Sequence, residues 1–529
     1  MDISYKNLSD TKAFARLKTL PPPPHLSTLL TPERIRDSSI PMGGGLTYNY
    51  AAKRFDSRIL EVLQNLADEQ QVIEKFRSLL NGEIMNTGEG RMVLHHLLRG
   101  QLGKQVIHQG KDLREFYRKE QERFYAFAEG VHQGKIKGST GKPFTQIVQI
   151  GIGGSDLGPR ALYLALKNLR EAQGQLKMKA LFLSNVDPDD ASGMLSQIDP
   201  ETTLFILVSK SGTTQETLTN EAFVLRRLAN SKTLAIVPKK HIVAVTSETS
   251  PLATSSDYLA AFYIDDFIGG RYSSTSAVGG VVLSLAFGKE TFEDLLAGAH
   301  EADTKALEPN ILQNPSLLDA LLGVYERNML AYPCTAILPY SQALHRFPAH
   351  LQQLDMESNG KRVNRYGEPI DYPTGPIVFG EPGTNGQHSF YQLLHQGTDI
   401  VPLQFIGFLH PQRGEDVEYK GSTSQQKLNA NLAAQITAFA RGKSSTDHNK
   451  EFPGNRPSSL IYGEQLTAKA LGALLAHYEN KVMFQGFLWN INSFDQEGVQ
   501  LGKTLASAAL AGTGEDPVLS TYSELLGVR

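Results

Sequence analysis

The chain has 529 residues, enough for several buried cores, and this length suggests about two to four domains. Its 52 basic and 55 acidic side chains give a net charge of −3, which excludes a global field that would attract nucleic acid or an anionic membrane. Cys334 is the only cysteine, so an intrachain disulfide and a multi-cysteine metal site are excluded as well.

Neither the N-terminus nor the longest apolar stretch indicates a membrane segment. Residues Met1 to Lys6 are charged and polar where a signal peptide needs an apolar core. The stretch from Ala277 to Phe287 contains glycine and serine and is too short to span a bilayer. We therefore expect a soluble, cytoplasmic protein.

The first part of the chain is predicted to be an extended arm followed by helices. The prolines at 21–24 fix an extended backbone, which favours a rigid surface connector over a ligand for a proline-binding module. From about Arg54 to Gly130 the apolar residues recur at helical spacing, as in Ile59, Leu60, Leu63 and Leu66.

From about Gln146 the pattern changes to short apolar runs separated by glycine-rich turns and helical segments. A first series of runs comprises residues 147–150, 180–183, 204–208 and 242–245. A second series comprises residues 335–338, 377–379 and 401–408. Strands that alternate with helices predict parallel sheets covered on both faces. The predicted fold class is α/β, with two parallel-sheet sandwiches in tandem and a helical end from about Gly463.

The turn at Gly151–Pro159 follows the first predicted strand but does not fit a nucleotide-binding motif. A dinucleotide fingerprint needs a third glycine where Asp156 stands, and Asp187 lies too far along the chain for the ribose-binding acid. No lysine follows Gly158, which excludes a P-loop. We interpret the segment as a close-approach turn that lines a sugar site.

The segment Ser209–Thr217 follows the buried run at 204–208 directly and carries five hydroxyl side chains within nine residues. One hydroxyl would be enough to cap the helix predicted from about Gln215. The excess of hydroxyls, together with Gly212 for close backbone approach, indicates a phosphate cradle at a helix N-terminus. Helix capping alone remains the alternative.

Two further segments carry candidate catalytic groups. Arg271 follows two glycines among small and apolar residues, so its guanidinium is predicted to face a cleft and stabilise negative charge. Gln353 and Glu357 are four residues apart and share a face if the segment is helical. Glu357 is the natural base, although a solvated pair with Lys361 is the alternative.

The last two candidate segments supply a histidine and a lysine. His388 is predicted in the first turn of a helix and could transfer a proton, although a single histidine is more often structural. Gln496 and Lys503 are seven residues apart, and we expect them on one helix face; an ordinary amphipathic helix is the alternative.

Together these segments resemble the glucose-6-phosphate isomerase family, also called phosphoglucose isomerase, closely and in chain order. The similarity includes the signatures Gly-Gly-Arg-Tyr-Ser at 269–273 and Phe-Asp-Gln-x-Gly-Val-x-x-Gly-Lys at 494–503. It runs from about Asn86 to Lys503. It departs from the usual family pattern at Ser211-Gly212 and at residues 86–91.

The resemblance implies two sugar-isomerase (SIS) α/β domains in an intertwined homodimer. We expect an N-terminal arm and helical region at 1–115, the first SIS domain at 116–290, the second at 291–505 and a tail at 506–529.

The resemblance also implies an aldose–ketose isomerase of glycolysis and gluconeogenesis that interconverts glucose 6-phosphate and fructose 6-phosphate through a cis-enediolate. It implies neither a metal nor an organic cofactor. Glu357 would be the base, Arg271 would stabilise the enediolate, and His388 of the neighbouring subunit would assist ring opening with Lys503. The other implied contacts are to the phosphate from Ser209, Lys210, Ser211 and Thr214; to the sugar from Gly154, Ser155, Gln353 and Gln496; and to His388 from Glu216.

Two rival functions share parts of this pattern. A non-catalytic sugar-phosphate sensor needs the phosphate cradle but has no use for Glu357, Arg271, His388 and Lys503 together. A different aldose–ketose isomerase, for example one acting on mannose 6-phosphate, would be distinguished by the shape of the site rather than by these motifs.

Overall fold

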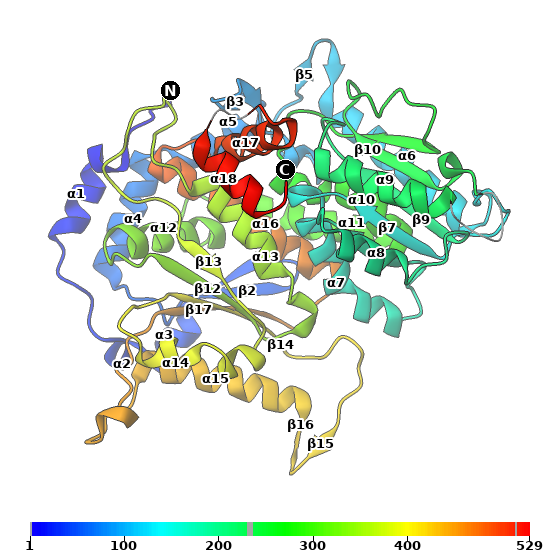
Figure 1. Ribbon diagram of the computed structural model, residues 1–529. Coiled ribbons are helices and arrows are strands. Elements are labelled where there is room, and N and C mark those ends of the chain that lie inside the picture. The colour runs from blue at the N-terminus through cyan, green and yellow to red at the C-terminus, as the bar shows by residue number, and fades with distance from the viewer. Residues whose placement is uncertain (1–2, 230–235, 514–515, 529) are drawn as a thin grey trace.

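The computed structural model describes residues 3–229, 236–513 and 516–528. Two α/β units lie side by side, each built around one sheet with helices packed on it (Figure 1). This arrangement confirms the predicted fold class of two sandwiches in tandem. The exact domain limits at 115/116, 290/291 and 505/506 stay predictions.

The first unit contains a five-stranded sheet in which all strands are parallel. Its spatial order is β11-β10-β9-β7-β8. The strands are β7 (Gln146–Ile150), β8 (Lys179–Leu183), β9 (Thr203–Val208), β10 (Ile242–Thr246) and β11 (Ala260–Tyr263). The first four were predicted from the apolar runs, and β11 was missed. The order reverses between β7 and β9, which makes the carboxyl ends of these two strands the expected ligand-binding edge.

Helices cover both faces of this sheet, because alternate residues of each buried strand face opposite sides. Leu204 and Ile206 of β9 pack into one core cluster, and Phe205 and Leu207 pack into another on the opposite face. The first cluster includes residues of α6 (Leu113–His132), α7 (Leu157–Ala172) and α10 (Ala277–Phe287). The second includes residues of α8 (Pro188–Leu195) and α9 (Gln215–Ala229).

The second unit contains a six-stranded sheet that includes the N-terminal hairpin. Its parallel strands are β12 (Cys334–Pro339), β13 (Ile377–Phe379), β14 (Leu403–Phe408) and β17 (Ser458–Gly463). The hairpin of β1 (Ser39–Gly43) and β2 (Leu46–Asn49) adds to β17 in antiparallel orientation. The N-terminal region is mainly helical, as expected, but it also extends this sheet.

The helices of the second unit again lie on both faces of the sheet. One face packs on α14 (Tyr391–Gln396) and α15 (Ser424–Arg441), and the other on α12 (Pro315–Asn328) and α16 (Ala468–Trp489). Every residue of α16 is buried except Lys469. The helix runs along α11 (Lys289–Lys305) and so joins the second unit to the helical layer beneath the first.

The remaining elements are short or peripheral. The N-terminal helices are α1 (Lys12–Thr19), α2 (Leu26–Leu29), α3 (Pro32–Asp37), α4 (Ser57–Glu69) and α5 (Val72–Leu80). Three small hairpins are β3–β4 (Ile84–Asn86 with Arg91–Met92), β5–β6 (Ile107–His108 with Lys111–Asp112) and β15–β16 (Glu418–Tyr419 with Ser422–Thr423). The prolines at 21–24 lie between α1 and α2, outside helices and strands, as an extended connector would.

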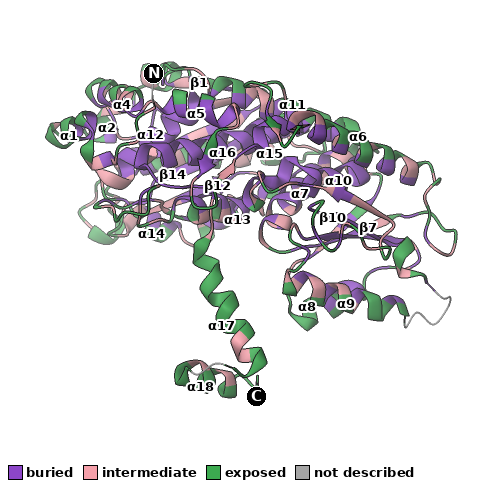
Figure 2. Ribbon diagram, turned by 90° about the horizontal axis from the view of Figure 1, so that it is seen from above, coloured by how far each residue is buried: buried purple, intermediate pink, exposed green. Residues whose placement is uncertain are grey.

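The C-terminal end forms an arm of two exposed helices, α17 (Gln500–Ala511) and α18 (Pro517–Leu525), which projects from the body in Figure 2. We call the described residues at this end, 500–513 and 516–526, the C-terminal arm. The helical end is confirmed. Helix α17 crosses the predicted limit at 505/506. Residues 514–515 and 529 of the predicted tail lie outside the described residues. Within the described ranges, no helix combines the length and the apolar character needed to cross a membrane.

Candidate active site

A cleft of about 470 Å³ lies between the two units, at the carboxyl ends of β7 and β9. This volume suits a small polar ligand such as a hexose phosphate.

 Eleven of the thirteen residues predicted to form the site line this cleft. They are Gly154, Ser155, Ser209, Lys210, Ser211, Thr214, Glu216, Gln353, Glu357, Gln496 and Lys503. Of the predicted set, Arg271 and His388 lie outside the lining. The cleft therefore brings the predicted phosphate cradle and the predicted base together.

The phosphate cradle is a tight loop between β9 and α9. Ser209 Oγ lies 3.0 Å from Thr214 Oγ1 and accepts a hydrogen bond from the Gly212 amide at 3.1 Å. Gly212 has φ +69°, and a Cβ at this position would lie 2.2 Å from Ser250 Oγ, so only glycine fits. The loop thus holds several hydroxyls at the N-terminus of α9, whose partial positive charge attracts anions.

The glycine turn after β7 lies directly against the segment that carries Arg271. A Cβ on Gly154 would lie 2.2 Å from the carbonyl carbon and oxygen of Gly270, so this contact requires glycine. The two short helices η3 (Gly153–Ser155) and η5 (Gly270–Thr275) can therefore touch and form one wall of the cleft. The turn lines the cleft through Gly153, Gly154 and Ser155, and its contact with a sugar stays a prediction.

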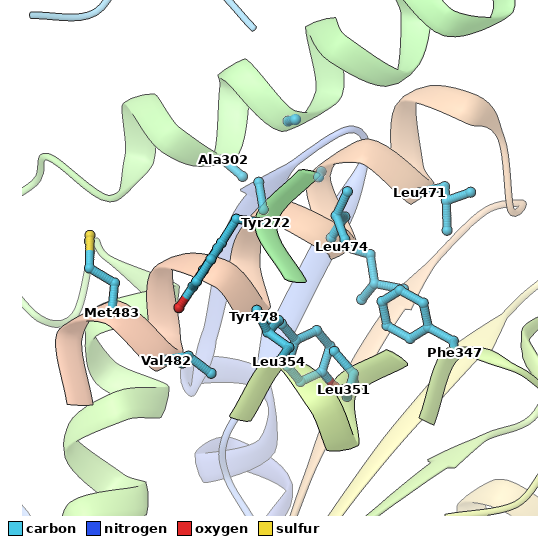
Figure 3. Close-up of a cluster of buried hydrophobic side chains, with 14 of the residues drawn as sticks. Tyr272, Ala302, Phe347, Leu351, Leu354, Leu471, Leu474, Tyr478, Val482 and Met483 are labelled. Atoms are coloured by element: carbon cyan, nitrogen blue, oxygen red, sulfur yellow. The ribbon is translucent and has the colours of Figure 1, made fainter. Parts of the chain in front are cut away.

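Gln353 and Glu357 lie on one face of a π-helical turn, η7 (Gln353–Glu357), which continues α13 (Phe347–Gln352). Gln353 Nε2 donates to Glu357 Oε2 at 3.1 Å, as their four-residue spacing predicted. Leu351 and Leu354 anchor the segment in the core beside Tyr478 and Val482 of α16 (Figure 3). The carboxylate of Glu357 is 22% exposed and faces the cleft. π-Helical turns often occur at functional sites.

Arg271 is buried behind Glu357 rather than free in the cleft. Its side chain is fully buried, and its Nη1 donates to Glu357 Oε2 at 3.2 Å. Its other acceptors are Ser358 Oγ at 2.7 Å, Gln496 Oε1 at 3.3 Å and the carbonyl oxygens of Ser493 at 2.7 Å and Asp495 at 2.9 Å. The guanidinium is therefore fixed in place with its charge one hydrogen bond from the carboxylate.

Gln496 and Lys503 both line the cleft, but they do not share a helix. Gln496 precedes the short turn η10 (Glu497–Val499), and α17 begins only at Gln500. The expectation of a common helix face is wrong, because the chain bends between the two residues. Lys503 lies on the exposed C-terminal arm.

His388 differs from the prediction in its local structure and lies outside the lining of the cleft. It ends the short helix η8 (Asn385–His388) and precedes α14, so it does not lie in the first turn of a longer helix. Its side chain is exposed at the surface. Glu216, in the first turn of α9, lines the cleft. The contact between Glu216 and His388 that the resemblance implies stays a prediction.

The cleft also contains charged residues that were not predicted as site residues, namely Glu89, Arg91 and Asp266, which lies beside the predicted Lys210. Lys210 Nζ lies 3.8 Å from Asp266 Oδ1 and donates to the Ile268 carbonyl at 3.4 Å. Burial lowers the pKa of Lys210 below the ordinary lysine value, and the nearby Asp266 opposes this shift. Glu89 and Arg91 form a 3.1 Å ion pair in the same lining. The segment at 86–91 departs from the usual family pattern, which is why the resemblance did not identify Glu89 and Arg91.

The donors and acceptors of the cleft suit an anionic sugar better than a metal. Within residues 3–229, 236–513 and 516–528, no three His, Cys, Asp or Glu side chains are placed to hold a metal ion. Hydroxyls, backbone amides and Lys210 gather at one end, while the carboxylate of Glu357, backed by Arg271, lies elsewhere in the same cleft. This arrangement can hold a phosphate and offer a base to another part of the same molecule.

Comparison with known proteins gives full-length matches. Residues 49–523 match the family described as phosphoglucose isomerase. A glucose-6-phosphate isomerase of Treponema denticola is 64% identical over 494 residues, which cover 93% of this chain and 93% of that protein. One of Treponema pallidum is 59% identical over 530 residues, which cover 99% of this chain and 98% of that protein.

A solved structure is similar over the same extent. The crystal structure of a glucose-6-phosphate isomerase from Chlamydia trachomatis has 45% sequence identity and a TM-score of 0.90. The match covers 99% of this chain and 100% of that chain.

Proposed function

The chain belongs to the phosphoglucose isomerase family and interconverts glucose 6-phosphate and fructose 6-phosphate in glycolysis and gluconeogenesis, and we propose the following roles for the residues of its cleft. The observation that carries these roles is the convergence of the loop at 209–214, Glu357 and Lys503 on one cleft.

The loop at 209–214 holds the phosphate. Ser209, Ser211 and Thr214 present hydroxyls, and the N-terminus of α9 adds backbone amides and a partial positive charge. Gly154, Ser155, Gln353 and Gln496 contact the sugar. Binding energy from the phosphate fixes the sugar carbons in register with the base, far from the phosphate itself.

Glu357 moves the proton between C2 and C1. It takes the C2 proton of the open-chain aldose, which leaves a cis-enediolate, and then returns this proton to C1. The O2 hydroxyl proton passes to O1 in the same conversion, which gives the ketose. Negative charge develops on the enediolate oxygens as the carbon proton leaves. Arg271, whose charge lies one hydrogen bond from Glu357, stabilises this charge from a fixed position.

His388 and Lys503 assist the opening of the sugar ring, and His388 comes from the second subunit of a homodimer. The exposed position of His388 outside its own cleft supports this arrangement. The C-terminal arm supports it as well, because Leu501, Leu525 and Leu526 are 70–78% exposed. Apolar side chains gathered on one projecting element commonly mark a protein interface.

Turnover of the phosphorylated and free sugars tests the site. A coupled assay should detect fructose 6-phosphate formed from glucose 6-phosphate. Free glucose should be a far poorer substrate in kcat as well as KM, because it lacks the group that the loop at 209–214 binds. Comparable turnover of free glucose would contradict the phosphate-binding role of this loop.

Subunit complementation tests the shared site. Glu357→Gln and His388→Ala chains should each be inactive alone. When they are unfolded together and refolded as a mixture, half of the dimers pair one chain of each kind, and one of their two sites is intact. About one quarter of the wild-type activity should return. A mixture as inactive as its components, in which mass spectrometry detects mixed dimers, would refute a histidine donated between subunits.

The same metabolic role supports a cytoplasmic location, which cell fractionation with an antibody to the chain would test.

A further inference from the structure

An ion pair between Lys361 and Asp495 lies beside the catalytic groups and has no role in the scheme above. Lys361 Nζ bonds to the Asp495 carboxylate and donates a second hydrogen bond, of 3.2 Å, to the Asp495 carbonyl oxygen. The two side chains are only 16% and 15% exposed. Such a shielded pair is screened less by salt than a surface pair and holds its geometry more firmly.

The Asp495 end of the pair is also an acceptor for Arg271. The same carbonyl oxygen that accepts from Lys361 accepts from Arg271 Nη2 at 2.9 Å. The next residue, Gln496, contacts Arg271 Nη1 through its side chain at 3.3 Å. A shift of Asp495 would therefore move two of the groups that fix the guanidinium.

The Lys361 end of the pair follows the catalytic base. Lys361 lies four residues after Glu357 and two residues after Asn359, where the helical run that contains η7 ends. Its backbone is fixed in turn, because its amide donates to Thr374 Oγ1 at 3.2 Å and its carbonyl accepts from the same hydroxyl at 2.6 Å. The ion pair thus ties the segment that carries the base to the segment that holds Arg271.

A third segment meets the same carboxylate. Asn492 Nδ2 donates to Asp495 Oδ2 at 2.6 Å and to Asn86 Oδ1 at 3.0 Å. Asp495 therefore lies where the glutamate segment, the segment before the C-terminal arm and the β3–β4 hairpin meet. Its position also sets the start of the chain that leads to Lys503.

We propose that Lys361 and Asp495 are positioning residues that set the geometry of Arg271 relative to Glu357. Neither residue lines the cleft, so neither has to touch the substrate. Without the pair, the segment at 493–496 is released on one side, and the guanidinium loses the fixed relation to the carboxylate. A misplacement of about 1 Å can cost roughly 100-fold in rate, whereas the phosphate loop stays intact. The inference rests on the proposed roles of Glu357 and Arg271.

The test is a double-mutant cycle of Lys361→Met, Asp495→Asn and the double variant, measured with glucose 6-phosphate. Each single variant should lower kcat by about 10- to 100-fold and change KM by less than about threefold. The double variant should be no slower than the slower single variant, because both changes break one interaction. Lys361→Arg keeps the positive charge and should recover part of the lost kcat.

A control breaks another lysine–carboxylate ion pair, which lies far from the cleft. Lys142 Nζ lies 3.0 Å from Glu201 Oε2, near the amino-terminal ends of β7 and β9, at the opposite edge of the sheet. Lys142→Met should leave kcat within about twofold of wild type. If Lys361→Met and Asp495→Asn lower only the melting temperature and leave kcat within twofold at 25 °C, the positioning role is refuted.

Two further variants separate the possible failures. If Lys361→Met does not fold, Asp495→Asn tests the same pair with an almost unchanged side-chain shape. If Arg271→Lys keeps full kcat, the proposed role of Arg271 itself is wrong. If Arg271→Lys is slow while both ion-pair variants are fast, only the positioning inference fails. Additive losses in the double variant would likewise overturn the proposal, because they would show that the two residues act independently.

Discussion

Replacement of Glu357 by glutamine should separate binding from chemistry. In the structure, Arg271 Nη1 and Gln353 Nε2 both donate to Glu357 Oε2, at 3.2 and 3.1 Å. The glutamine amide has nearly the same shape as the carboxylate and can still accept a hydrogen bond from one of them. If the ligand loses one charge-assisted hydrogen bond to residue 357, the cost is about 1.5 kcal/mol, or roughly tenfold in the affinity for a sugar-phosphate inhibitor. The loss of the general base is worth 10²–10⁴-fold, and we expect a loss of roughly 10⁴ in kcat, because no other residue is assigned to accept the C2 proton.

The main measurement is the exchange of the C2 proton of glucose 6-phosphate in deuterated water, which NMR detects. The value of kcat and the affinity of a competitive sugar-phosphate inhibitor are measured for the same variants. Wild-type enzyme should incorporate deuterium at C2, and Glu357→Gln should not, while the inhibitor binds within about tenfold. Glu89→Gln is the matched control, because Glu89 is a second carboxylate in the lining of the cleft and has no assigned role in the reaction. Exchange by Glu357→Gln near the wild-type rate would refute Glu357 as the base.

Three further predictions concern binding, packing and pH. Thr214→Ala should raise KM for glucose 6-phosphate about tenfold, the value of one charge-assisted hydrogen bond; an unchanged KM in steady-state assays would contradict a phosphate contact. Gly154→Ala should lower the melting temperature and the activity, because the new Cβ would lie 2.2 Å from the Gly270 backbone. As a control, Gly193→Ala should leave the melting temperature almost unchanged, because the space around its Cβ is open. Burial lowers the pKa of Lys75 from 10.5 to about 7. Between pH 7 and 10.5 the unfolded chain therefore binds more protons than the folded chain. The free energy of unfolding consequently rises with pH, by up to about 1.4 kcal/mol per pH unit. Lys75→Met should lose this rise in urea titrations at pH 7 to 10; an unchanged slope would argue against a neutral buried amine.

The apolar pattern was enough to predict most of the framework. Runs such as 204–208 became strands because every residue of β9 is buried between two helical layers, which a continuous apolar run indicates. β17 was missed, since it begins with two serines, and the β1–β2 hairpin is short and adds to a sheet whose other strands lie far along the chain. Local patterns do not reveal such distant pairing.

The site was predictable as a set of motifs but not as a geometry. The four-residue spacing of Gln353 and Glu357 gave their contact, because that relation is local. The burial of Arg271 was not foreseeable, since its acceptors at 358, 493 and 495 lie 87 to 224 residues away in sequence. The bend between Gln496 and Lys503 likewise depends on where α16 ends and the C-terminal arm begins.

Topology explains why the motifs converge although they are spread over the chain. The loops after β7 and β9 meet because the strand order of the first sheet reverses between them, which opens a crevice at their carboxyl ends. The segment after β12 of the second sheet brings Glu357 to the same crevice, and α16 leads the chain back to it at Gln496. Each unit alone thus supplies an incomplete site: the first holds the phosphate loop and Arg271, and the second holds the base. Because Arg271 joins these parts through Glu357, Ser358 and Asp495, the catalytic geometry depends on how the two units pack against each other.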